Sequence, residues 1–459
     1  MSTRFLPRAN LWLLVATTYS AQLLTGGAEP YHFLLACATL FLLWLIQSSR
    51  FGFWDPAAIF VAMSSLYVVS PSLEVAILGN ALGFDPRRVN LLVDASVCYV
   101  LAAGIAIAVL RREPAPVQGS PAVKSRLAFE LETVARICVA LFGAYFTMVA
   151  VRYGLSIGGI GRAELYADRF VLLSVIRQIL SIALIYAFAL IKAARVAGLQ
   201  PVRPVFVWVV TTAVLFGAAD LLILGDRRLA LTTFLAVAPL LMAPRIRPLQ
   251  ALGLALAAVA LLLYSVVRNT PVSEWSSRLD GVDLLVRLNP AAAEFGVVAI
   301  IAGTIEDLDE FPKDFPSYGD AVLQLVPRAI LPDRPKAPSE WFAWRYYPEY
   351  ASTGGGFAFS SVVEALGNFG LVGVPVVGFL IGACLVALTR WRILTAPVGV
   401  CFATFVFVFS MRMEFASVLR NALFVLSAMI ILTGVASLLR FFRMRGIRPN
   451  GGVEVEIAP

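Results

Sequence analysis

The stretch STGGGFAFSSVVEALGNFG, residues 352–370, contains a serine and a glutamate three residues apart, Ser361 and Glu364. This S-x-x-E spacing is typical of a helix start, with Ser361 as the N-cap and the helix beginning at Val362. Three glycines before it (Gly354, Gly355 and Gly356) could turn backbone N–H groups toward an anion. A helix N-terminus also attracts phosphate. Glu364 is therefore either the helix cap or a general base and ligand for an acceptor hydroxyl.

Basic side chains that we expect outside the membrane could bind phosphate, because a planar guanidinium holds phosphate oxygens in pairs and stays charged. Any one of them could instead extend to the lipid headgroups. Arg227 and Arg228 are harder to explain in that way, because a helix pair turns back there with almost no loop. The candidate ligands are Arg162, Arg169, Arg227, Arg228, Arg287, Arg328, Arg334, Lys336 and Arg412.

Three carboxylates compete for the role of base: Glu364, Glu414 and Asp333. The acidic run EDLDE, residues 306–310, matches no calcium-loop spacing, so it predicts a solvated turn. The five cysteines lie in apolar runs without metal-ligand spacing, and His32 is the only histidine. The sequence predicts no metal, no cofactor and no catalytic scheme that needs a pair of histidines.

The composition predicts an all-α polytopic membrane protein. Hydrophobic residues make up 59% and charged residues 14% of 459 residues, and the mean hydropathy is +0.83, whereas a soluble chain has about 25% charged residues. The net charge of +8 points to membrane topology and anionic lipid-linked substrates rather than to nucleic acid. No phosphate-binding P-loop is present, so the energy for an external reaction must arrive within the substrate.

Apolar runs long enough to span a bilayer, about 20 residues each, predict twelve transmembrane helices. Within them, Asp220 is expected to pair with a basic partner, and Gly378 and Gly382 to let a neighbouring helix approach closely. The expected spans are 10–25, 31–47, 57–77, 90–110, 131–151, 170–191, 205–224, 227–243, 249–267, 371–389, 394–411 and 418–439.

Basic residues in the short loops predict the orientation. With a cytoplasmic N-terminus, the inside segments hold 18 lysines and arginines and the short outside loops hold eight, which is the positive-inside pattern. Both termini are therefore expected in the cytoplasm. The apolar stretch 291–305 contains Glu294 and is short, so we interpret it as a surface helix rather than a span.

These spans predict four regions: helices one to nine in 1–267, a periplasmic loop in 268–370, helices ten to twelve in 371–439, and a cytoplasmic tail in 440–459. A loop of this length is usually functional. We therefore expect substrate binding and catalysis in the loop and at the neighbouring helix ends.

The loop resembles the Wzy-type polymerases of O-antigen and exopolysaccharide repeat units. The resemblance rests on Tyr318-Gly319, LVPRAILPDRPK, GGGFAFS, Glu364 and Asn368-Phe369-Gly370, in that order, and extends over roughly residues 150–420. It implies a metal-independent membrane glycosyltransferase of GT-C-like architecture in the bacterial inner membrane. Such an enzyme transfers a growing glycan from undecaprenyl pyrophosphate to the non-reducing end of a lipid-linked repeat unit.

The resemblance also implies residue roles. Arg162, Arg227, Arg328 and Lys336 would hold phosphates, and Glu364 and Asn368 would orient the acceptor or the sugar. Arg328 and Asn368 are accordingly expected to be catalytic together with Glu364. The partners would be undecaprenyl-pyrophosphate-linked oligosaccharides and the lipid bilayer. Whether a chain-length regulator also binds is left open.

Two alternatives stay open at this stage. An O-antigen ligase would share the architecture, but the external loop lacks a histidine, which argues mildly against it. A flippase for lipid-linked oligosaccharides should show repeated halves and polar residues at the midplane. The charges instead cluster at the predicted outer face.

Overall fold

The computed structural model of the protein describes fourteen parts of the chain, and all of its regular elements there are helical. They are residues 38–45, 54–78, 86–111, 121–154, 171–199, 203–224, 227–241, 275–278, 297–305, 311, 314–326, 330–352, 358–390 and 396–446.

Within the described residues, nine longer helices form the body of the protein. Three of them begin with proline, which suits a first helical position because its missing N–H has no partner there anyway. They are α3 (Pro56–Leu78), α4 (Pro86–Leu110), α5 (Pro121–Tyr153), α7 (Val171–Val196), α8 (Arg203–Leu222), α9 (Arg227–Leu241), α17 (Ser361–Arg390), α18 (Ala396–Phe407) and α19 (Phe415–Gly446). The shorter elements are α11 (Trp275–Arg278), α13 (Val297–Thr304), α14 (Tyr318–Leu323), α15 (Pro338–Tyr346), α16 (Pro348–Ser352) and the 3₁₀ turn η3 (Ser410–Arg412).

Six of these helices are long and apolar enough to cross a membrane, counted over the described residues: α4, α5, α7, α8, α17 and α19. Shorter apolar helices occur at Pro56–Val68, Leu229–Ala238 and Val398–Arg412. Nine of the twelve expected spans thus coincide with a helix. Of the others, 10–25 and 249–267 lie outside the described residues, and 31–47 is represented by helical residues 38–45. The multi-pass helical class is confirmed, whereas the number twelve stays a prediction.

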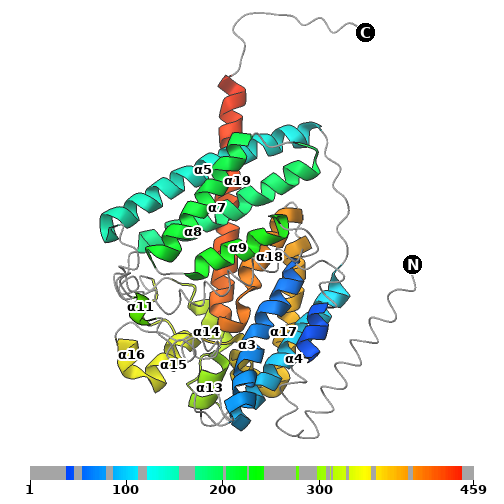
Figure 1. Ribbon diagram of the computed structural model, residues 1–459, viewed down its shortest axis with the longest axis vertical. Coiled ribbons are helices and arrows are strands. Elements are labelled where there is room, and N and C mark those ends of the chain that lie inside the picture. The colour runs from blue at the N-terminus through cyan, green and yellow to red at the C-terminus, as the bar shows by residue number, and fades with distance from the viewer. Residues whose placement is uncertain are drawn as a thin grey trace, which may run out of the picture.

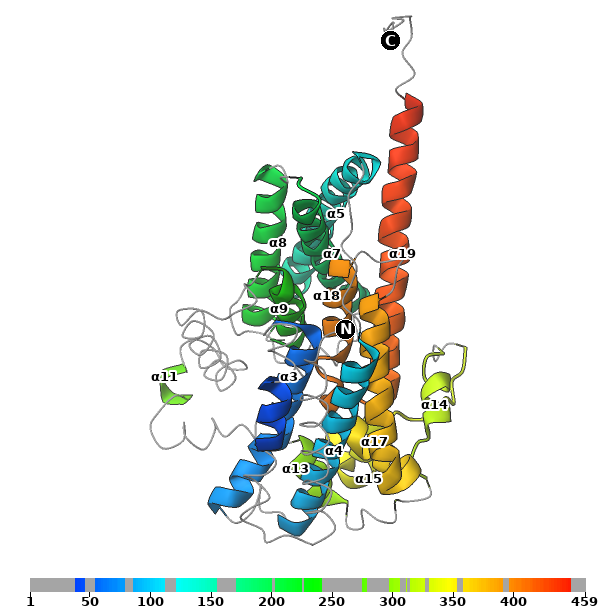
Figure 2. The same cartoon turned by 90° about the vertical axis from the view of Figure 1, so that its right-hand side faces the viewer.

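The helices form two groups that α18 joins. In Figure 1, α5, α7, α8 and α9 lie obliquely across the upper half of the molecule, above α3, α4 and α17. Helix α18 contacts α7 and α9 in the first group and α3 and α17 in the second. Figure 2 shows α19 running along one side and projecting beyond the other helices at its C-terminal end.

Helix α17 reverses direction at Gly370, where φ is 67° and ψ is −166°. That conformation is open essentially only to glycine. In a straight helix, residues eight apart are separated by about 12 Å along the axis. A Cβ on Gly373 would nevertheless lie 3.0 Å from the carbonyl oxygen of Ala365. Residues 361–369 therefore form a short helix folded back against the span that begins after Gly370, and this span corresponds to the predicted one at 371–389.

Helix α4 packs against both halves of this hairpin. A Cβ on Gly378 or on Gly382 would overlap the carbonyl oxygens of Tyr99 and Ala103 on α4, which confirms the predicted packing role of the two glycines. The hydroxyl of the same Tyr99 lies 3.2 Å from Ser361 Oγ. Residues 361 and 378 would be about 25 Å apart in a straight helix, so a single α4 side chain can meet both only because α17 is folded back.

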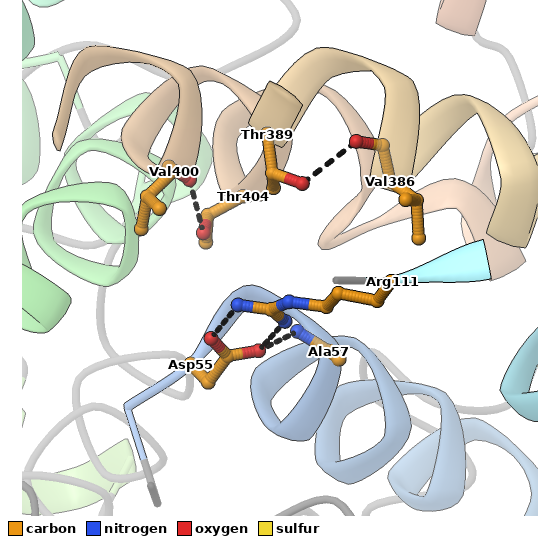
Figure 3. Close-up of polar contacts among 7 residues, drawn as sticks. All are labelled: Asp55, Ala57, Arg111, Val386, Thr389, Val400 and Thr404. Carbon is orange, nitrogen blue, oxygen red and sulfur yellow. Dashed lines mark hydrogen bonds and ion pairs between the residues drawn. The ribbon is translucent and has the colours of Figure 1, made fainter. Parts of the chain in front are cut away.

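Among the described residues, one buried and one largely buried ion pair join helices of the body. Arg177 of α7 donates two hydrogen bonds to Asp220 of α8, at 2.7 and 2.8 Å, and Tyr145 of α5 donates a third at 3.3 Å. This confirms the predicted basic partner of Asp220. At the end of α4, Arg111 pairs with both carboxylate oxygens of Asp55, which also accepts the Ala57 N–H and so caps α3. Figure 3 shows this second pair facing the ends of α17 and α18.

Of the short helices between α9 and α17, Figure 2 shows α13, α14 and α15 near the lower part of α17 and α11 apart from it. Helix α13 is the described part of the apolar stretch 291–305, has eight residues and packs on α3 and α4. Residues 291–296 lie outside the described part of the chain, so the decision against a span stays a prediction. Helix α14 contacts α19.

Candidate functional site

Glu364 is the centre of the candidate site. Its side chain is 0% exposed. One carboxylate oxygen, Oε2, accepts the backbone N–H of Phe415 at 2.5 Å, at the start of α19. The other, Oε1, has no hydrogen-bond partner and no cation within ion-pair distance among the described residues. Buried polar groups are nearly always satisfied, so an unpartnered carboxylate oxygen requires an explanation.

The helix cap differs from the predicted capping box. Helix α17 begins at Ser361, and the hydroxyl of Ser360 accepts the N–H of Val362 at 3.2 Å, so Ser360 is the cap. Ser361 is already helical, and its hydroxyl donates to the Ser410 carbonyl at 2.8 Å. Because Glu364 holds the Phe415 N–H instead of its own helix start, the interpretation of Glu364 as a cap is wrong.

Asn368 lies one turn after Glu364 and ties the loop to α17. Its amide nitrogen donates to the carbonyls of Glu364, at 2.9 Å, and Pro316, at 3.3 Å. Its amide oxygen accepts the Tyr318 N–H at 3.2 Å. Three protein contacts thus occupy this side chain, which makes it well suited to position the loop segment beside Glu364. Its predicted contact with the sugar is not tested.

Tyr318, the first residue of α14, covers the same region. Its ring stacks on Phe369 at 5.4 Å and 6° and meets the Phe415 ring edge-on at 5.2 Å. Its hydroxyl oxygen is buried without a hydrogen-bond partner in the described structure. Burial raises the pKa of this hydroxyl, and the nearby Glu364 carboxylate raises it further. Tyr318 therefore stays protonated and can donate a hydrogen bond at any working pH.

Three of the predicted phosphate ligands have described side chains, and their surroundings differ: Arg334, Lys336 and Arg412. Arg412 is in η3, which contacts α17, and it precedes Phe415 by three residues. Arg334 donates to the carbonyls of Gln324 and Val326, at 2.9 and 3.1 Å, and so braces the chain after α14. Lys336 is exposed, with its ammonium group 5.3 Å from the ring centre of Trp344.

Several expected residues lie outside the described part of the chain. They are Arg162, Arg169, Arg287, Arg328, Gly354, Gly355, Gly356 and the acidic run 306–310. Arg227 and Arg228 begin α9, but their side chains are not described. Among the residues that are described, no three histidine, cysteine or acidic side chains form a group that could hold a metal ion.

The rival carboxylates have different surroundings. Asp333 is exposed. Glu414 is 6% exposed, and its Oε1 accepts a hydrogen bond from Ser417 in the first turn of α19. Glu364 alone among the three combines complete burial with an oxygen that has no partner in the described structure. It is therefore the most suitable base on geometry.

Sequence reasoning missed two contributors to this site. Tyr99 comes from α4 and reaches Ser361 across 262 positions of the chain. Ser410 lies in η3, with its hydroxyl oxygen buried and without a partner in the described structure. The only available signal for Tyr99 was a tyrosine within an apolar span, where its hydroxyl requires a polar partner.

Fold and site together define a multi-pass helical membrane protein with a buried polar cluster where the start of α17 meets α14, η3 and the start of α19. A family model described as O-antigen polysaccharide polymerase Wzy matches residues 336–445. The matched segment runs from α15 to the end of α19 and contains Glu364, Asn368 and Arg412. The match confirms the resemblance for this part of the chain. No curated protein and no solved structure matches the chain.

Proposed function

We propose that the protein is a polysaccharide polymerase that transfers a growing glycan from undecaprenyl pyrophosphate onto the non-reducing end of a lipid-linked repeat unit. The reaction would take place at the periplasmic face of the bacterial inner membrane, with both termini in the cytoplasm. The family match over residues 336–445 supports the activity. The observation that carries the site is the fully buried Glu364 with one unpartnered carboxylate oxygen inside the matched segment.

Glu364 acts as the general base of the transfer. The acceptor hydroxyl oxygen forms a bond to the anomeric carbon of the donor glycan, and the bond from that carbon to the pyrophosphate oxygen breaks. The hydroxyl proton passes to Glu364 Oε1, and undecaprenyl pyrophosphate leaves with the electron pair. Positioned general bases contribute about 10²–10⁴-fold to such reactions.

Arginines stabilise the leaving group. A guanidinium fork binds pyrophosphate oxygens in pairs and needs no metal ion to do so. Arg412 joins the site through η3, while Arg162, Arg227, Arg328 and Lys336 supply the remaining positive charge in this proposal. Both the donor and the acceptor are lipid-linked oligosaccharides in this proposal. Their negative charges explain why a chain with few charged residues carries an excess of arginine.

Access to Glu364 requires movement of the segment that carries Tyr318. The carboxylate is 0% exposed, and Tyr318 contacts both Phe369 and Phe415 beside it. Only the Asn368 amide hydrogen-bonds this segment to α17 among the contacts described. Opening of the segment admits the acceptor, and its return excludes water from the reaction.

The test is a reconstituted reaction with purified protein and lipid-linked repeat units, analysed for product length. The polymerase produces a ladder of lengthened glycans on the lipid carrier. Turnover only when a core-lipid acceptor is added would indicate a ligase. Movement of the substrate across a vesicle membrane without any new glycosidic bond would overturn both assignments in favour of a transporter.

A further inference from the structure

A half-open cavity of about 600 Å³ lies between α5 and α19, away from Glu364. This volume is within the range of about 300–1,000 Å³ that is usual for ligand pockets. Its wall is mostly apolar and includes Phe129, Ile137 and Leu439, and it carries one positive and one negative side chain, Arg136 and Glu132. The cavity can therefore accept a ligand with an apolar body and a charged end.

The cavity lies where two predicted spans meet the membrane surface. The span 131–151 begins among its lining residues on α5, and the span 418–439 ends at its lining residue on α19. Both boundaries are on the same predicted side, the cytoplasmic one. Lipid headgroups occupy this depth of a bilayer, above about 30 Å of hydrocarbon.

The ion pair in the wall is exposed and easily rearranged. Arg136 donates to Glu132 one turn earlier at 2.5 Å, and the two side chains are 69% and 43% exposed. Exposed pairs at this spacing contribute only about 0.3–0.5 kcal/mol, so a ligand with matching charges can replace the contact. A phosphate group suits the guanidinium of Arg136, and a primary ammonium suits the carboxylate of Glu132.

We propose that this cavity binds the headgroup of phosphatidylethanolamine from the cytoplasmic leaflet. The phosphate contacts Arg136, the ammonium contacts Glu132, and an acyl chain lies along Phe129, Ile137 and Leu439. An anionic phospholipid without an ammonium group binds less well, because its phosphate would leave Glu132 without a cation next to a negative ligand. The site is separate from the transfer reaction and holds a structural lipid between α5 and α19.

Native mass spectrometry of the full-length protein tests the proposal, with phosphatidylethanolamine or phosphatidylglycerol of identical acyl chains added to the detergent-purified protein. Wild type should retain phosphatidylethanolamine in preference to phosphatidylglycerol. The double substitution Glu132→Gln and Arg136→Gln should weaken binding of the ethanolamine lipid by at least about tenfold, because it removes two charge-assisted contacts and one alone accounts for such a factor. Leu439→Trp should also weaken binding of phosphatidylethanolamine, because the larger side chain fills the cavity without a change of charge.

Arg126→Gln is the control, since Arg126 is an exposed arginine of α5 that pairs with a glutamate one turn away, Glu130, but does not line the cavity. It should bind phosphatidylethanolamine as wild type does. Equal retention of both lipids by wild type would overturn the proposal. Unchanged ethanolamine-lipid binding in the Gln double variant, whose substitutions lie on an exposed surface, would overturn it as well.

Discussion

Asp220 and Glu364 are both carboxylates with 0% exposure, yet their surroundings are opposite. Asp220 receives two hydrogen bonds from Arg177 and one from Tyr145, so both of its oxygens are satisfied. Glu364 receives one backbone N–H on Oε2, and Oε1 has no partner in the described structure. The first carboxylate closes a contact among three helices, and the second keeps an acceptor available.

This difference separates a structural charge from a functional one. A buried ion pair with full hydrogen bonding offsets the cost of removing its charges from water, although it seldom stabilises more than packed apolar residues would. An unmade hydrogen bond in a buried site costs about 1–3 kcal/mol. Proteins tolerate this loss of stability at sites where the unpartnered oxygen takes part in binding or chemistry.

The largest expected effect on folding stability comes from Arg177→Ala. It removes the guanidinium that donates two hydrogen bonds to the buried Asp220, and it should cost about 3–5 kcal/mol. Thermal unfolding in detergent and the yield of monodisperse protein measure the loss. The double substitution Arg177→Leu and Asp220→Leu should restore most of the stability, because no charge remains buried. An Arg177→Ala single variant as stable as wild type would contradict the structural role of Asp220.

A smaller loss is expected from Gly370→Ala, at the reversal of α17. A side chain at this φ and ψ costs about 1–3 kcal/mol, and relief of the strain would displace residues 361–369, and with them Glu364. Gly434→Ala is the matched control, because Gly434 is helical and a Cβ there meets nothing within 4 Å. The control should be neutral or slightly stabilising. Equal thermal stability of both variants would contradict the folded-back geometry.

The smallest expected effect on stability comes from Tyr318→Phe. It removes a hydroxyl that has no partner in the described structure and keeps both ring contacts, so unfolding should change by no more than about 0.5 kcal/mol. Elongation should fall by about tenfold, because the hydroxyl is expected to bind substrate once the segment has returned, and one hydrogen bond accounts for such a factor. If the Tyr318→Phe variant elongates glycans at the wild-type rate, the hydroxyl does not bind substrate and Tyr318 contributes only ring packing.

Much of the body was predictable, because apolar length and charge report directly on membrane spans. The pairing of Asp220 and the packing of Gly378 and Gly382 followed from the cost of a lone buried charge and from small-residue spacing. The reversal at Gly370 was not predictable, since a glycine inside an apolar run does not reveal its φ. Nor was the approach of Tyr99 to Ser361, because a contact across 262 positions leaves no local pattern.

Within the site, Glu364 was identified for a partly mistaken reason. The S-x-x-E spacing indicated a helix start correctly to within one residue, but the cap is Ser360, and Glu364 reaches α19 instead. Adjacent serines at 360 and 361 allow either cap, and the choice depends on where the Ser410 carbonyl lies. Tertiary contacts therefore determine which of the two serines caps α17.

The most direct test is Glu364→Gln, assayed as folded protein for elongation of lipid-linked repeat units. Glutamine keeps the shape and removes the buried charge, so the variant should fold with wild-type stability or better. Its elongation rate should fall by about 10²–10⁴-fold, the contribution of a general base. Glycan ladders of normal length, made at a normal rate by the folded variant, would contradict the assignment of Glu364 as the base.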